Sequence, residues 1–391
     1  MSAHAAAADV REHRPERAPP AQWRLRVAQF DISHNAIPLA FYAFTATLAT
    51  ATRVGFPRTV VDVAFYISFA VLVLTSSLTV LRVIIHPAAF LQDFSNARLQ
   101  NFFYLPSIVG ALVLITLPSP FRLWIPMAVS FYTLFAYQFL LSLYLYGNWL
   151  HALSLPETIY PLAFMQTVGY FLLSIVASML VMPQLAFFLL TAALLFWLLI
   201  FTTLFQHSPT TLKAANESPS PIFFLFLAPP AQATIAALFL NATRIFSNTD
   251  PPSQSFLPGG PLPWNMGAEL AHYVNLFLYA LMIRMLPLWI SRPFSVVWWA
   301  YVFPVAGASA AIILRFEKTR TTFWKVMSVA SATVSGLAIV IVTFFTLRAI
   351  WKGNFPKNKA NEMVYREYWK RRDVFSRMKL PIMPHAVVDN V

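Results

Sequence analysis

The sequence has no cysteine among its 391 residues and few charged side chains. The first absence excludes disulfides, thiolate metal sites and thiol catalysis. Asp, Glu, Lys and Arg make up only 11% of the chain, whereas about a quarter of the residues of a soluble globular protein are charged. The uncharged stretches 218–243, 293–314 and 326–347 can each cross a bilayer, because a spanning helix needs about 20 mainly apolar residues. The composition excludes a soluble enzyme, a secreted disulfide module and a DNA-binding domain. It predicts an all-α integral membrane protein with several spans.

The side chains that membrane-bound enzymes need are also scarce. No HExxH, Walker or GxSxG motif occurs, and the acidic residues lie almost wholly outside the apolar stretches. His272 lies inside one of them, beside Glu269, but without the spacing of a metal site. Ion-coupled transporters usually keep an ionisable residue at mid-membrane, and none is evident here. We therefore expect no enzyme activity, no cofactor and no metal, and we favour a passive transport path.

Apolar runs between polar or proline-rich breaks divide the chain into ten predicted spans. An even number of spans places both termini on the same side of the membrane. The Asn241-Ala-Thr243 sequon lies so close to a predicted membrane edge that we expect it to be unused. The spans are 33–54, 60–85, 101–117, 121–146, 160–181, 184–206, 221–243, 267–290, 294–314 and 323–351.

Basic residues gather at the two ends of the chain, whose net charge is +13. With both termini in the cytoplasm, the cytoplasmic segments hold 20 Lys and Arg residues and the opposite side eight, as the positive-inside rule requires; only the loop at 315–325 disagrees. We expect a cytoplasmic arm over 1–32 with no signal peptide or presequence, a ten-helix domain over 33–351, and a basic cytoplasmic tail over 352–391. The tail should lie on anionic lipid headgroups. This placement argues against nucleic acid as a partner.

Proline marks alternate spans. The odd spans contain Pro38, Pro106, Pro229-Pro230 and Pro304, and Gly110, Gly169 and Gly307 fall on the same spans. A proline removes one backbone donor and frees a carbonyl one turn earlier, which is tolerated in a membrane where neighbouring helices bury the break or a cavity hydrates it. The pattern predicts kinked odd helices that line a central pore, each followed by a straighter even helix, as five hairpins around one axis. The alternative is that proline is simply frequent in membrane helices.

Several segments resemble a known family of membrane proteins. Arg98-Leu-Gln-Asn-Phe-Phe-Tyr-Leu-Pro106 resembles the start of the third helix of the plant guard-cell slow-type anion channels. Phe294-Ser-Val-Val-Trp-Trp-Ala-Tyr-Val-Phe-Pro304 is similar to a more specific run in their ninth helix. The family includes the bacterial tellurite-resistance and C4-dicarboxylate transporter proteins, fungal malate permeases and sulfite exporters. Further similar segments, in the same order, are Tyr146-Gly-Asn-Trp149, Leu204-Phe-Gln206, Ala228-Pro-Pro-Ala231 and Phe277-Leu-Tyr279.

The resemblance implies a ring of five hairpins with one pore per subunit, usually assembled as a trimer in the plasma membrane. It also implies that Phe303, just before Pro304, is the pore gate, with ordinary helix packing as the alternative. Two departures stand out. The first span, from Ile37 to Ala46, has alanines where relatives tend to have glycines, and the long phosphorylatable tails of the plant channels are absent.

We therefore expect a passive conduit for small anions of the chloride and nitrate class. The alternative is a secondary transporter or exporter of C4-dicarboxylate, sulfite or related oxyanions, and a membrane scaffold or enzyme is a third class. Arg82 and Arg284 either attract anions at a pore mouth or anchor the ends of even spans. Weak polar sites in the pore have a competing interpretation as helix-to-helix hydrogen bonds. These candidates are Thr45, Ser107, Thr167, Thr234 and Ser309.

Overall fold

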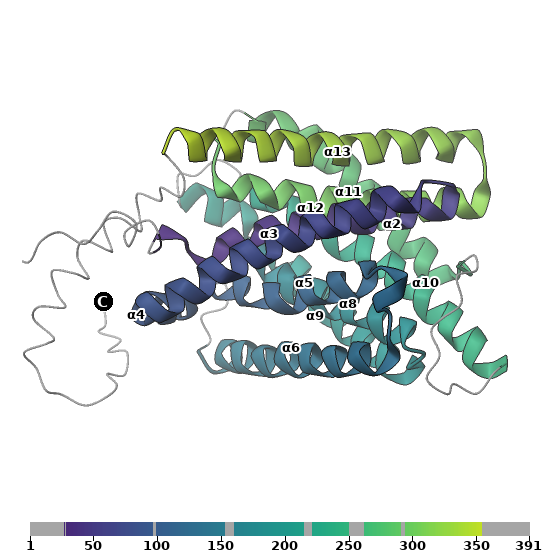
Figure 1. The fold of residues 1–391 in the computed structure, drawn as a ribbon, viewed down its shortest axis with the longest axis horizontal. Helices are drawn as coiled ribbons and strands as arrows, with labels where there is room; N and C mark the ends of the chain where they lie inside the picture. The colour runs from purple at the N-terminus through teal and green to yellow at the C-terminus, as the bar shows by residue number, and fades with distance from the viewer. Residues whose placement is uncertain are drawn as a thin grey trace, which may run out of the picture. The chain divides into compact units, whose positions relative to one another are not determined.

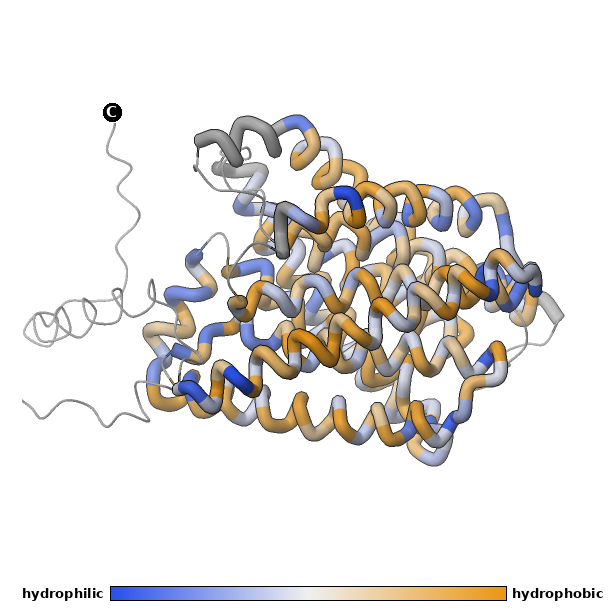
Figure 2. Tube along the Cα trace, turned by 90° about the horizontal axis from the view of Figure 1, so that it is seen from above, coloured by the Kyte–Doolittle hydropathy of each residue, from blue (hydrophilic) through white to orange (hydrophobic). Residues whose placement is uncertain are grey.

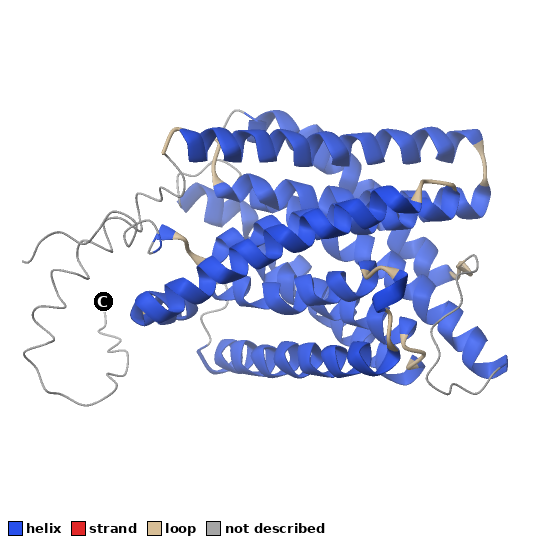
Figure 3. Ribbon diagram, viewed as in Figure 1, coloured by secondary structure: helices blue, strands red, loops and turns tan. Residues whose placement is uncertain are grey.

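The computed structural model describes residues 27, 29–96, 99–152, 160–214, 221–249, 262–290 and 294–353. Every regular element in these ranges is a helix (Figure 3), which confirms the all-α prediction. Contacts divide the chain into a unit formed by 31–355 and another formed by 1–30 with 356–391. The helices below belong to the first unit, and the predicted tail lies outside the described residues from 354 onward.

Each predicted span coincides with a helix. Among the described residues, eight helices are long and apolar enough to cross a membrane. A ninth span results if α4 and the segment Gln100–Thr116, which meet at a bend of 104°, are counted together. The remaining predicted span is α2, whose 16 residues are extended at both ends by 3-10 turns. The elements are η1 Ile32–Asn35, α2 Ala36–Ala51, η2 Thr52–Val54, α3 Arg58–Ile85, α4 Pro87–Ser95, η3 Gln100–Tyr104, α5 Leu105–Thr116, η4 Ser119–Phe121, α6 Trp124–Ala152, η5 Pro161–Ala163, α8 Phe164–Met179, α9 Pro183–Ala214, η6 Pro221–Leu227, α10 Ala228–Thr249, α11 Met266–Ile290, η7 Val296–Trp298, α12 Trp299–Thr319 and α13 Thr322–Trp351.

Odd and even spans differ sharply in burial. In the most apolar window of α8 all residues are buried, and in those of α10 and α12 78% are buried. The corresponding shares are 17% for α3 and 28% for α6, α9 and α13, because these helices present apolar side chains outward, as lipid requires. Figure 2 shows hydrophobic residues along the middle of the helices and hydrophilic ones mainly near their ends. The odd helices therefore form the interior of the unit.

The contacts of the odd helices close into a circuit. α2 contacts α5, α5 contacts α8, α8 contacts α10, α10 contacts α12, and α12 contacts α2. Each odd helix also contacts the even helix that follows it in sequence. In Figure 1, α13 and α6 lie at opposite edges of the helical unit, with α5 and α8 between them. These contacts define five helix pairs, each made of one inner (odd) helix and the outer (even) helix that follows it.

Each inner helix begins in the same way, with a short 3-10 segment that leads into an α-helix. Pro38, Pro106, and the pair Pro229 and Pro230 lie within the first three residues of α2, α5 and α10. A proline in the first turn costs no intrahelical hydrogen bond, because those N–H groups have no partner inside the helix. Pro304 is the sixth residue of α12, so it leaves the carbonyl of Ala300 without its usual helical donor.

Buried hydroxyl groups join inner helices to their outer partners. Thr45 of α2 lies 2.9 Å from the Ser68 hydroxyl of α3, and Ser174 of α8 donates to the Ala186 carbonyl of α9 at 2.7 Å. Ser309 of α12 donates to the Ser331 carbonyl of α13 at 2.8 Å. With no competing water in the membrane interior, such bonds fix how each inner helix is rotated.

The fourth such bond joins α5 to α6, where the Ser107 hydroxyl donates to Gln138 Oε1. The Gln138 amide also donates to the Gln166 carbonyl of α8 at 2.9 Å. Gly169 makes room for this side chain, since a Cβ at that position would lie 2.6 Å from Gln138 Nε2. Gln138 therefore connects two inner helices through an outer one.

Candidate functional site

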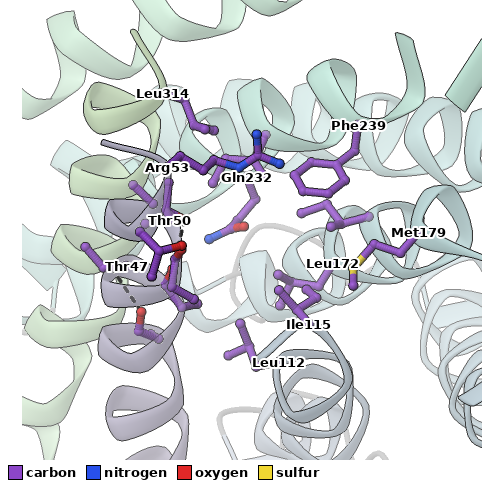
Figure 4. A pocket seen from close by; sticks show the side chains of 18 of the residues that line it. Thr47, Thr50, Arg53, Leu112, Ile115, Leu172, Met179, Gln232, Phe239 and Leu314 are labelled. Carbon is purple, nitrogen blue, oxygen red and sulfur yellow. Dashed lines mark hydrogen bonds between the residues drawn. The ribbon is translucent and has the colours of Figure 1, made fainter. Parts of the chain in front are cut away.

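The five inner helices enclose a cavity of about 270 Å³, called the large cavity below. Its lining comes from α2, α5, α8, α10 and α12, in each case beyond the first turn, together with Arg53, Arg58 and Arg122 from adjoining loops and helix ends. Figure 4 shows Arg53, Gln232 and Phe239 around this space, with Leu172 and Met179 on one side and Thr47 and Thr50 on the other. The wall is mostly apolar, with polar groups from α2 and α10.

A second and smaller cavity, of about 30 Å³, lies at the N-terminal ends of the same helices and is called the small cavity. Leu39 of α2 and Phe303 of α12 line it, while Ala43 and Gly307, one turn further along the same helices, line the large cavity. The inner helices therefore run in the same direction along the line that joins the cavities. A layer at the level of Phe303 separates them, and Phe303 itself is only 1% exposed.

Three arginines line the large cavity, and each is held in place. Arg53 pairs with Glu317 at 3.3 Å, and Arg58 pairs with Asp62 at 3.3 Å. Arg122 donates instead to main-chain carbonyls at the end of α5, those of Leu117 at 2.8 Å and Ile115 at 3.2 Å. Cations are favoured at a helix C-terminus, where the unpaired carbonyls give a partial negative charge. Among the described residues, the three guanidinium groups and the two carboxylates paired with them carry one net positive charge at this rim.

The sequence profile described as "Voltage-dependent anion channel" matches residues 29–347 of this chain. The match covers all five inner helices and both cavities. The chain belongs to the voltage-dependent anion channel family. The resemblance seen in the sequence is thereby confirmed.

Among curated proteins the chain is similar to members of this family from Arabidopsis thaliana. It is 25% identical to the S-type anion channel SLAH2 over 306 residues, which cover 77% of this chain and 55% of the relative. It is 26% identical to the guard cell S-type anion channel SLAC1 over 322 residues, 81% of this chain and 54% of the relative. The chain thus spans about half the length of the curated relatives it matches.

The polar residues that the sequence proposed for a pore point elsewhere. Thr45, Ser107 and Ser309 bind the outer helices, as described above. Thr167 and Thr234 donate within their own helices, to the carbonyls of Phe164 and Pro230, each at 2.9 Å. The lining of neither cavity includes any of the five. The hydrogen bonds of Thr45, Ser107 and Ser309 therefore agree with the competing interpretation, in which such residues join one helix to another.

The two arginines proposed for a pore mouth line neither cavity. Arg82 is 3% exposed and forms an ion pair with Asp93 of α4, so a carboxylate already neutralises its charge. Arg284 is exposed on α11. Arg82 fastens α4 to the end of α3. The anchor interpretation of Arg284 stays a prediction.

Gln232 and the arginines at 53, 58 and 122 are lining residues that the sequence analysis did not select. Gln232 has neither a charge nor a hydroxyl, and its signal in the sequence is its place in an uncharged span two residues after Pro230. Arg122 counted only as a basic residue of an external segment. Its position between Pro118 and the next apolar run was the available signal, since an arginine there can reach back to the end of the preceding helix.

Two further sequence candidates have packing partners. His272 is fully buried between the rings of Trp264 and Trp324, each with its centroid 5.4 Å away. The part of the chain that the structure describes has no group of three His, Asp or Glu side chains placed to hold a metal.

The Asn241 amide of the sequon donates to the Pro263 carbonyl at 3.0 Å.

Proposed function

We propose that this chain is a passive conduit for small anions, closed at the level of Phe303. The observation that carries the proposal is the pair of cavities. All five inner helices line the large one, and the small one is lined by α2, α8, α12 and the 3-10 segments that lead into the inner helices, with one apolar layer between the two cavities. The family and the S-type anion channels among its relatives supply the class of ion.

Closure follows from the apolar character of that layer. An ion that passes Phe303 has to shed water, and no charged side chain lies at this level to replace it. Hydrophobic constrictions block ions in this way, by excluding water. Phe303 lies one residue before Pro304, where the helix lacks a hydrogen bond, so the ring can turn aside with little disturbance of the backbone.

The charges around the large cavity favour anions over cations. The excess positive charge at the rim raises the local concentration of anions. No Lys or Arg lies inside the inner helices between the two cavities, so the path offers no fixed charge that would bind an anion strongly. Weak binding lets an ion leave again, which conduction requires. Permeability should follow ease of dehydration, with nitrate ahead of chloride and dianionic malate far behind.

The setting of the conduit is also part of the proposal. The charge bias of the loops supports cytoplasmic termini and places the large cavity on the external side. A plasma-membrane location and a homotrimer with one pore per subunit are what the family resemblance implies. The basic tail would lie on anionic lipid.

The proposal is tested by reconstituting the full chain in liposomes loaded with chloride or nitrate. A potassium gradient with valinomycin should drive efflux of both anions, with nitrate faster and malate slow. Efflux should not depend on a proton or sodium gradient. Transport of malate or sulfite that requires such a gradient would establish the secondary transporter instead.

A further inference from the structure

The Gln232 side chain lies at the floor of the large cavity. It is the fifth residue of α10, is 5% exposed, and lines the cavity opposite the apolar residues of α5 and α8. Figure 4 shows its amide directed into the space between Thr50 and Leu172. No group among the described residues forms a hydrogen bond with this amide. The amide faces the accessible space of the cavity, where a water molecule or an ion can bind it.

Gly307 determines how close this amide comes to the constriction. A Cβ at Gly307 would lie 2.8 Å from Gln232 Nε2, so only glycine leaves room for the side chain in this position. Gly307 follows Phe303 by one turn of α12. The Gln232 amide therefore lies immediately on the large-cavity side of the layer that closes the conduit.

The other polar groups deep in this cavity are engaged. Thr47 donates to the Ala306 carbonyl at 2.8 Å, and Thr50 donates to the Ala46 carbonyl at 2.8 Å. Their hydroxyl hydrogens are therefore not free for an anion. Among the described lining residues below the arginine rim, this leaves the amide of Gln232 as the side-chain N–H donor.

We propose that Gln232 coordinates the permeating monovalent anion just before it passes Phe303 and thereby sets the chloride-to-nitrate permeability ratio. The inference rests on the proposed function. An anion at this point has lost part of its hydration, and N–H donors bind an ion more strongly than they bind a neutral group. Chloride concentrates its charge more than nitrate does, so a donor offsets more of the dehydration cost of chloride. Gln232 should thus narrow the preference for nitrate that an entirely apolar path would show.

The test compares reversal potentials under bi-ionic chloride and nitrate conditions for the full chain in planar bilayers. Each variant is measured in two backgrounds, the wild-type chain and the Phe303→Ala chain. The second background is included because Phe303→Ala should raise the current. Gln232→Leu keeps the approximate size and removes the donor, so the nitrate-to-chloride permeability ratio should rise about threefold or more. Gly307→Ala pushes the amide away from this position and should shift the ratio in the same direction.

Gln166→Leu is the matched control. Gln166 is 1% exposed on the inner helix α8, its amide has no partner among the described residues, and it lines neither cavity. This variant should leave the ratio unchanged. An anion current whose ratio is the same in Gln232→Leu as in the parent chain would overturn the assignment while leaving the conduit intact. If no variant conducts anions at all, the proposed function fails, and the role of Gln232 fails with it.

Discussion

Replacing Phe303 by alanine should open a path between the two cavities. The ring is 1% exposed and lies in the layer between spaces of about 30 and 270 Å³. Removing it leaves a void that joins them, which water can enter from the polar end of the large cavity. Desolvating an ion inside a protein costs several kcal/mol even after relaxation, and every 1.4 kcal/mol removed from a barrier raises a rate about tenfold. Partial relief of this barrier should raise resting anion conductance several-fold to about tenfold.

The same substitution has a predictable effect on stability. Phe→Ala in a packed core typically costs about 3–5 kcal/mol, but water that enters from the large cavity should reduce this cost. We expect a lower thermal unfolding midpoint in detergent together with a higher chloride conductance in planar bilayers. A residue that only packs would show the first effect without the second.

Phe131→Ala is the control for this experiment. Phe131 is fully buried on the outer helix α6 and lines neither cavity. This variant should lose stability and keep the conductance of the wild type. If Phe303→Ala reaches the membrane in normal amount and conducts no more than wild type, the role of Phe303 as a gate is refuted.

Three further outcomes are expected. Arg122→Gln removes the excess charge at the rim, so anion current should fall about twofold in 10 mM salt and hardly change in 1 M salt, where screening is strong; equal loss at both concentrations would argue against an electrostatic role. Gly169→Ala should displace Gln138 and lower stability by about 1–3 kcal/mol in thermal unfolding, whereas Gly147→Ala, where nothing lies within 4 Å, should not; similar midpoints for the two would show that the Gln138 connection is unimportant. Epitope tags at both termini should be protected in intact cells and a tag near Ser255 accessible; labelling of a C-terminal tag would reverse the topology.

The order of helices and the inner position of alternate ones follow directly from the sequence. Long uncharged runs have few structural options in a membrane, so each predicted run coincides with a helix among the described residues. Pro304 lies inside the buried helix α12, where neighbours can compensate for the lost backbone bond, whereas Pro106 lies in the first turn of α5, where no helical bond is lost. α4 was missed, because nine residues after His86 are too short to stand out by hydropathy. It is held by the pair of Arg82 and Asp93, which are 11 positions apart in sequence.

The direction in which a polar side chain points was much harder to predict. Thr45 and Thr47 are two residues apart on α2, yet one binds α3 while the other lines the large cavity. Both residues are threonines on the same helix, and only the rotation of the helix about its axis decides which of them faces the cavity. That rotation depends on partners such as Ser68, which lie on a different helix. Gln232 is placed by Gly307, 75 positions further along the chain, so no local pattern revealed it.

Unitary current recording from the purified full chain in planar bilayers tests the central claim most directly. With a chloride solution on one side of the bilayer and a nitrate solution on the other, a passive conduit should show discrete openings. Its reversal potential should place nitrate ahead of chloride and should not move when a proton or sodium gradient is added. Replacing nitrate by malate should nearly abolish the current carried by the anions on that side, while the chloride current from the other side remains. Transport without resolvable openings, or a malate permeability equal to that of nitrate, would contradict the account.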